Sequence, residues 1–226
     1  MKQFAVIGLG RFGSRVAIGL YQEGADVVAV DVNEELVDEI KNLVTTAIVM
    51  DATDEKALAT LQPDGLSGVI VAIGKDVEAS ILITAVLSEM NAPKIMSRAS
   101  NELQARILRL VGADAVIYPE DDMATRLVRN LVSPLILDQI ELYENTVLAQ
   151  VVVPDSFVGS SLRELDLRAA HGLNVVTIKA ARPPEPKAPH PPMADNVPNP
   201  DYRLQTADTL VVVGDPVRLR GLAEME

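Results

Sequence analysis

Residues 8–13 read Gly8-Leu9-Gly10-Arg11-Phe12-Gly13, a G-x-G-x-x-G loop that directly follows the apolar run of residues 4–7. In such a loop the first glycine permits a tight turn, the second lets a diphosphate approach the backbone, and the third lets a helix pack on the strand. Free backbone N–H groups at the start of that helix then face the anion. The pattern predicts a strand–loop–helix unit that binds the phosphates of a nucleotide.

An acidic residue, Asp31, closes the second apolar run, 21 residues after Gly10. A carboxylate at this spacing accepts hydrogen bonds from a ribose diol and repels a 2′-phosphate, so NADP is not expected. NAD, ADP, ATP and AMP all remain open. Arg11 either adds charge-assisted bonds to a further phosphate oxygen or faces solvent. The alternative for the whole loop is that its glycines serve packing alone.

On either side of this loop, short apolar runs alternate with helical stretches as far as residue 118. The runs are continuously apolar, which is typical of parallel strands buried on both faces. Six such alternations predict an α/β fold, with a doubly wound, Rossmann-like parallel sheet in an N-terminal domain of residues 1–118. The expected strands are residues 4–7, 27–30, 47–49, 69–73, 94–96 and 115–118.

Polar or small residues follow several of these strands, where ligands of such sheets bind. Asp51-Ala52-Thr53 follows the third strand, where it could border an adenine, or Thr53 could cap the next helix. Asn33 is placed to cap the second helix. Ala72-Ile73-Gly74 ends the fourth strand, and Gly74 either lets a ligand come close or forms a plain turn.

The alternation of apolar runs and helical stretches ends after residue 118. Residues 119–142 are expected to form a helical connector or dimer arm, with one helix, a break at Ser133-Pro134 and a second short helix over 135–142. Met123, Leu127 and Leu131 share one face of the first helix. A small α+β domain is expected over residues 143–226, with a proline-rich surface loop at 182–200. Its expected strands are 147–153, 175–179 and 209–213, and its expected helices are 161–170 and 216–223.

Composition narrows the class of function. The 226 residues are 48% hydrophobic, enough for a core, and the net charge of −12 without a basic patch argues against a nucleic-acid partner. No apolar run is long enough to cross a bilayer, so direct membrane insertion is not expected. Cysteine is absent, and the only histidines, His171 and His190, lie late in the chain. A binding module is therefore favoured over an NAD-dependent oxidoreductase, an NAD(H) redox sensor, or a protein that holds nucleotide constitutively.

The chain resembles the cytosolic regulatory subunits of bacterial potassium uptake systems, the KtrA/TrkA type with RCK domains. The combination of Gly10-Arg11-Phe12-Gly13 with Pro119-Glu120-Asp121-Asp122-Met123 is the most specific part of the resemblance. The matching strings extend over nearly the whole chain: residues 4–13, 30–35, 51–53, 71–74, 112–114, 119–123 and 165–172.

The resemblance implies a regulatory subunit, not an enzyme, in which ATP and ADP compete for the N-terminal lobe and ATP activates transport. It places Arg11 on the terminal phosphate of ATP, Asp31 on the ribose, and Arg98 near the phosphates, where the family often has lysine. The implied nucleotide-binding residues are Gly8, Gly10, Arg11, Phe12, Gly13, Asp31, Val32, Asn33, Asp51, Ala52, Thr53, Ala72, Ile73, Gly74, Arg98 and Glu120.

It also implies partners. Glu120 would help hold a cation (Mg, Ca or Na) between ATP phosphates across a dimer interface, or would simply be an acid at a helix N-terminus. Arg168 would contact cyclic di-AMP in the C-terminal lobe, or be a surface arginine. Dimers would assemble into an octameric ring beneath a membrane potassium-translocating subunit of the KtrB/TrkH type. The chain would then be cytoplasmic, peripheral to the inner face of the cell membrane.

Overall fold

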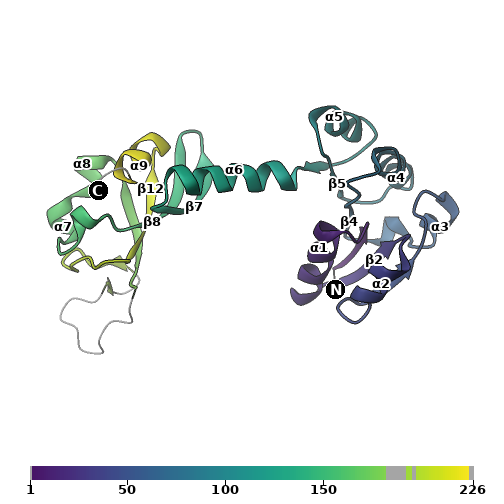
Figure 1. Cartoon of the computed structure of the whole chain (residues 1–226), viewed down its shortest axis with the longest axis horizontal. Helices are drawn as coiled ribbons and strands as arrows, with labels where there is room; N and C mark the ends of the chain where they lie inside the picture. The colour runs from purple at the N-terminus through teal and green to yellow at the C-terminus, as the bar shows by residue number, and fades with distance from the viewer. Residues whose placement is uncertain (1, 182–191, 195–196, 224–226) are drawn as a thin grey trace. The chain divides into compact units, whose positions relative to one another are not determined.

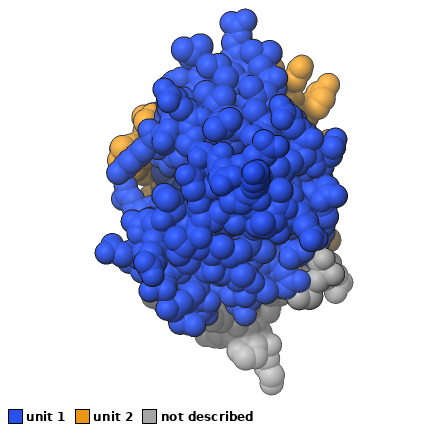
Figure 2. All heavy atoms as spheres, turned by 90° about the vertical axis from the view of Figure 1, so that its right-hand side faces the viewer, with its two compact units in different colours: residues 1–123 blue, residues 124–226 orange. Residues whose placement is uncertain are grey.

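A computed structural model describes residues 2–181, 192–194 and 197–223 (Figure 1). The chain divides into two compact units, Met1–Met123 and Ala124–Glu226, which Figure 2 distinguishes by colour. The division falls inside helix α6 (Pro119–Val132).

The first unit contains a six-stranded sheet in the order β3-β2-β1-β4-β5-β6. Every pair of neighbouring strands is parallel, which confirms the doubly wound sheet expected from the apolar runs. The chain reverses its direction of travel between β1 and β4, and ligands of such sheets bind at this switch point. The strands are β1 (Gln3–Ile7), β2 (Asp26–Asp31), β3 (Thr46–Val49), β4 (Gly68–Val71), β5 (Ile95–Arg98) and β6 (Ala115–Ile117).

Helices cover both faces of this sheet. Ala17 of α1 and Val37 of α2 belong to the core on one face. Leu58 of α3 and Ile83 of α4 belong to the core on the other, and Leu108 of α5 lies in a small cluster that includes Ile81 of α4. The helices are α1 (Arg11–Gln22), α2 (Glu34–Ile40), α3 (Glu55–Ala59), α4 (Val77–Glu89) and α5 (Glu102–Leu110), with a short 3₁₀ turn η1 (Pro63–Gly65) before β4.

Two helix starts test the capping predictions. The side chain of Asn33 accepts a hydrogen bond from the N–H of Glu35 at 2.9 Å, which confirms it as the cap of α2. The prediction that Thr53 caps α3 is wrong, because Asp54 accepts from the first free N–H groups of that helix. The Thr53 hydroxyl instead donates to Asp51 at 2.6 Å, since Asp51 lies two residues earlier and closes a tight turn around it.

The second helix predicted for the 119–142 connector is also wrong. After α6 the chain forms a strand, β7 (Ile136–Tyr143), which pairs antiparallel with β8 (Thr146–Val152). A two-residue turn, Glu144-Asn145, joins them, and Asn145 adopts a left-handed backbone conformation (φ +55°), which asparagine tolerates better than most residues. Pairing with β8 therefore overrides the helix-forming tendency of this leucine- and glutamate-containing segment.

The second unit is built on an antiparallel sheet in the order β7-β8-β12-β9. Its core includes Val151, Phe157 and Leu210. The single helix expected over 161–170 divides at Asp166, whose left-handed backbone ends one helix and whose side chain caps the next. Outside residues 182–200, the other elements are η2 (Asp155–Phe157), α7 (Leu162–Leu165), α8 (Leu167–His171), β9 (Asn174–Lys179), β12 (Thr209–Gly214) and α9 (Pro216–Ala223).

Most of the proline-rich loop expected at 182–200 lies outside the described residues, which resume at 192–194 and again from 197. The described part is not entirely irregular, because β10 (Met193–Ala194) pairs antiparallel with β11 (Val197–Pro198).

Candidate functional site

The phosphate loop has the backbone that its glycines predict. Gly8 has a φ of +95°, a conformation open mainly to glycine. A Cβ on Gly13 would lie 1.8 Å from the carbonyl oxygen of Gly8, so the start of the helix packs directly on the turn. A Cβ on Gly10 would meet nothing within 4 Å, which leaves the outer side of the loop open to a ligand. The three glycines therefore serve three different purposes.

The N-terminus of α1 is open to an anion. Gly10 is its capping residue and supplies no side-chain acceptor, and no acidic residue occupies the first turn. The positive end of the helix dipole and the first free N–H groups are thus available to a phosphate. Arg11 is exposed beside them and makes no ion pair with any described residue. Sequence reasoning missed Ser14, whose hydroxyl donates to the carbonyl of Leu9 at 2.7 Å and steadies the loop from within the helix.

Asp31 ties this loop to the neighbouring strand. Its Oδ2 accepts from the N–H of Leu9 at 2.6 Å, and its Oδ1 accepts from the N–H of Asn33 at 2.8 Å. A carboxylate offers about four acceptor positions, so capacity remains for ribose hydroxyls. Val32, next to it, is 70% exposed. The expected ribose-binding acid therefore also acts as an anchor for the phosphate loop.

The predicted adenine-side cluster follows β3. The Oδ1 of Asp51 accepts from both the N–H and the hydroxyl of Thr53, and these bonds, the side-chain bond foremost, lower the pKa of Asp51. Asp51 is exposed, whereas Ala52 is buried in the core beneath it. The carboxylate is thus held in a fixed position at the edge of the sheet.

Across the switch point, the end of β4 lies under a guanidinium group. Ala72 is buried, and a Cβ on Gly74 would lie 2.2 Å from Nη1 of Arg98. Nη2 of Arg98 donates to Oε1 of Glu120, the second residue of α6. The Nε of Arg98 is buried and has no hydrogen-bond partner among the described residues. The structure therefore brings Arg98 and Glu120 together within one chain.

The fold gathers the predicted nucleotide-binding residues at one edge of the parallel sheet, since they follow the carboxyl ends of its strands or, for Glu120, open the helix after β6. Arg168, exposed on α8, belongs to the other unit. Within the described part of the chain, no three His, Asp or Glu side chains converge as a ready metal site. A cation at Glu120 would therefore need ligands from outside this set, such as phosphate oxygens or a second copy.

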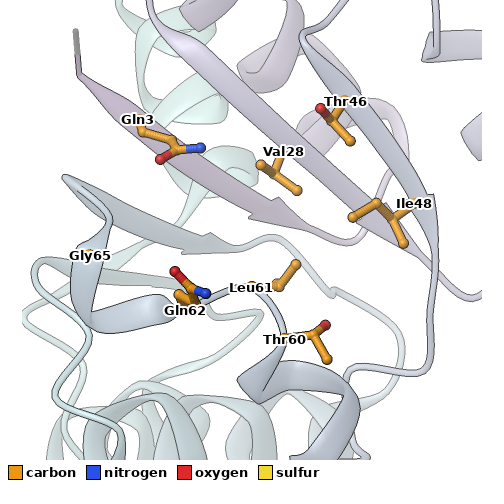
Figure 3. Close-up of a pocket in the computed structure, with 8 residues that line it drawn as sticks. All are labelled: Gln3, Val28, Thr46, Ile48, Thr60, Leu61, Gln62 and Gly65. Carbon is orange, nitrogen blue, oxygen red and sulfur yellow. The ribbon is translucent and has the colours of Figure 1, made fainter.

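A separate cavity of about 350 Å³ lies away from this edge (Figure 3). It opens between strands β1, β2 and β3 and the segment that runs from the end of α3 into η1. No residue of the phosphate loop lines it. Its lining combines neutral polar and apolar side chains with one glycine: Gln3, Val28, Thr46, Ile48, Thr60, Leu61, Gln62 and Gly65.

Comparison with known families assigns both halves of the chain. The TrkA-N domain matches residues 4–119, and the TrkA-C domain matches residues 148–225. The chain belongs to the KtrA/TrkA family. Among its KtrA/TrkA relatives, Ktr system potassium uptake protein C of Bacillus subtilis is 41% identical over 181 residues, covering 80% of this chain and 82% of that protein. Ktr system potassium uptake protein A of Vibrio alginolyticus is 37% identical over 218 residues, covering 96% and 94%.

Solved structures agree with this KtrA/TrkA assignment at the level of fold. The GsuK channel superposes with a TM-score of 0.67 at 16% identity, and its NAD-bound form with a TM-score of 0.63 at 18% identity. Each covers 99% of this chain, which in turn spans only 39% of the channel chain. Within the described residues, none of the helices is long and apolar enough to cross a membrane.

Proposed function

We propose that this chain is a regulatory subunit of a potassium ion transporter that binds ATP and ADP and turns over no substrate. The observation that carries the proposal is the open N-terminus of α1, beside the exposed Arg11, which has no ion-pair partner in the described part of the chain. The chain is 37% identical to a Ktr potassium uptake protein over almost its whole length. Binding of ATP would favour the transport-activating conformation. A ligand shifts such an equilibrium only through its different affinities for the two states, so the extra phosphate of ATP must make contacts that ADP lacks.

The residues at the sheet edge divide this task. Gly8, Gly10 and Gly13 let the diphosphate approach the backbone, and Arg11 binds the terminal phosphate. Asp31 accepts from the ribose, with Val32 and Asn33 beside it. Asp51, Ala52 and Thr53 border the adenine, and Ala72, Ile73 and Gly74 form the opposite wall of the site.

Assembly and location follow from the same proposal. Met123, Leu127 and Leu131 on α6 are 62%, 56% and 73% exposed, and a second copy of the chain is the partner we propose for this apolar face. Such dimers would form an octameric ring that binds a KtrB/TrkH-like potassium-translocating subunit, which places the chain in the cytoplasm at the inner face of the membrane. Glu120 would contribute to a Mg, Ca or Na ion that also contacts the ATP phosphates.

One alternative function uses the same residues. NAD(H) carries the same adenosine diphosphate half, and the contacts of Asp31 do not distinguish it from ADP, so a redox sensor is the second candidate. In the other unit, Arg168 is exposed on the last turn of α8 and is our candidate contact for cyclic di-AMP.

The test is calorimetric titration of the nucleotide-free protein with ATP, ADP and NADH. We expect ATP and ADP to bind, NADH to bind weakly, and Arg11→Ala to weaken ATP more than ADP. Arg109→Ala is the matched control, because Arg109 is an exposed arginine in the last turn of α5, far from the phosphate loop in the sheet topology. If NADH binds more tightly than ATP and ADP, and Arg11→Ala does not change nucleotide affinity, the ATP-gating proposal is wrong and redox sensing replaces it.

A further inference from the structure

The Arg98–Glu120 ion pair joins the nucleotide edge to the helix that leaves it. Arg98 ends β5 and Glu120 lies in the first turn of α6, 22 residues later. The Arg98 side chain is only 20% exposed, whereas that of Glu120 is 63% exposed. Arg98, the less exposed partner, is thus held at the sheet, whereas Glu120, the more exposed partner, belongs to α6.

Arg98 also lies in line with the phosphate loop. A Cβ on Gly8 would sit 3.0 Å from Cγ1 of Ile73, so the loop rests on the end of β4. The next residue, Gly74, lies directly against the Arg98 guanidinium, with Cζ only 2.6 Å from the position of a Cβ. The loop, residues 73–74 and the guanidinium thus form one continuous row across the edge of the sheet.

The guanidinium is incompletely satisfied in this arrangement. It carries five N–H donors, and its buried Nε has no partner among the described residues. Buried donors without a partner are uncommon, and a position that binds an acceptor ligand is one explanation for such a donor. A phosphate group is the acceptor that we favour, because it accepts two parallel hydrogen bonds from arginine and carries more negative charge than a carboxylate.

We propose that the Arg98–Glu120 ion pair is a latch that a nucleotide phosphate releases. Without nucleotide, Glu120 neutralises Arg98 and holds the first turn of α6 at the sheet edge. A bound phosphate competes for the guanidinium, and Glu120 is displaced. This inference rests on the proposed nucleotide-binding function.

The test measures ATP affinity in excess EDTA, so that competition for Arg98 is separated from any role of Glu120 toward a cation. Glu120→Gln removes the competitor and is expected to tighten metal-free ATP about threefold or more. Arg98→Gln is expected to weaken it about tenfold or more. In the double variant the gain from Glu120→Gln should vanish, because the two changes act on one interaction.

Asp121→Asn is the matched control, since Asp121 is an exposed acid in the same helical turn, and among the described residues Arg98 pairs with Glu120 and not with Asp121. An equal gain in Asp121→Asn, or no gain in Glu120→Gln while the wild type binds ATP, overturns the latch and leaves the nucleotide-binding function standing. Failure of the wild type to bind any nucleotide overturns both.

Hydrogen exchange supplies a readout independent of affinity. The N–H of Asp122 donates to the carbonyl of Tyr118 at 3.0 Å, within the turn that the latch holds. We expect exchange over residues 119–124 to accelerate when metal-free ATP is added, and to be fast already in Arg98→Gln without nucleotide. Slower exchange on addition of ATP would overturn the proposal.

Discussion

The backbone N–H of Leu9 donates to Oδ2 of Asp31 at 2.6 Å, so the phosphate loop is fastened to the end of β2 by the residue expected to bind ribose. One carboxylate therefore connects the two parts of the predicted nucleotide site. Its second oxygen, which accepts from the N–H of Asn33, also sets the turn that leads into α2.

Replacement of Asp31 should accordingly affect both folding and binding. Asp31→Ala leaves the partly buried N–H of Leu9 without its acceptor, which we expect to lower the free energy of unfolding by about 1–3 kcal/mol. Nucleotide affinity should fall as well, while Glu39→Ala, an exposed change on α2, should alter neither quantity. Urea unfolding and calorimetry measure the two effects, and unchanged stability in Asp31→Ala would show that the loop does not depend on this anchor.

Substitutions of two glycines of the loop should affect protein stability and nucleotide affinity separately. A Cβ on Gly13 would meet the backbone oxygen of Gly8, so Gly13→Ala is expected to destabilise the protein by about 1–3 kcal/mol. Gly10→Ala has open space and an ordinary φ of −64°, so stability should be kept while nucleotide affinity falls about tenfold or more.

Gly19→Ala, inside α1 and also free of neighbours within 4 Å, is the control for these two changes. It should leave binding intact and stabilise the helix by about 0.5–1 kcal/mol. Thermal unfolding measures the stability of the three variants, and titration measures their nucleotide affinity. Nucleotide binding by Gly10→Ala as tight as that of the wild type would contradict this division of roles.

The sequence predicts the parallel-sheet half of the fold well because the signals for its strands and first loop are local. Continuous apolar runs specify buried parallel strands, and the spacing from Gly10 to Asp31 specifies the first βαβ unit. The sequence of β7 taken by itself predicts a helix, because its residues suit a helix in isolation, and only pairing with the partner strand β8 makes it a strand. The Asn145 turn between them was the available signal.

The contacts of the site could be predicted less completely than its position. Thr53 and Asp54 are both common capping residues, and which of them caps α3 depends on the turn that Asp51 closes. The contact of Arg98 with Gly74 and Glu120 depends on the order of strands in the sheet. A sequence read by itself does not supply that order, and the roles of these residues toward a nucleotide stay predictions.

Asp208 should dominate the stability of the second unit. Its fully buried carboxyl group accepts from the hydroxyl of Tyr202 at 2.8 Å and from the N–H groups of Ala181 and Gln205, both at 2.9 Å. Asp208→Ala leaves three donors unsatisfied, which we expect to cost about 2–4 kcal/mol. Tyr202→Phe removes only one of these bonds and should cost less. Chemical unfolding followed by circular dichroism makes the comparison, and equal losses in both variants would argue against a network centred on Asp208.

The capping box of α7 should make the second unit sensitive to acid. Hydrogen bonds from Ser161, aided by Arg203, lower the pKa of Glu164 below its ordinary value of 4.5. A depressed pKa in the folded state contributes stability above the unfolded value, and this contribution is lost as the pH falls through the folded pKa. Unfolding measured from about pH 6 down to about pH 3 should therefore depend less on pH in Glu164→Gln. Identical pH profiles would exclude this contribution.

The apolar face of α6 should determine the oligomeric state. Leu127 is 56% exposed between Met123 and Leu131, and burial of these side chains against a second copy would remove them from water. Leu127→Glu would place a charge in that contact, so we expect the dimer dissociation constant to rise at least about tenfold. Thr125→Glu introduces the same charge on the opposite side of the helix and should leave the dimer intact. Sedimentation equilibrium measures the dimer dissociation constant of both variants. If the dimer forms through this face, only the glutamate at position 127 should weaken it. Equal weakening by both variants would therefore indicate a general effect of the added charge and would argue against this contact.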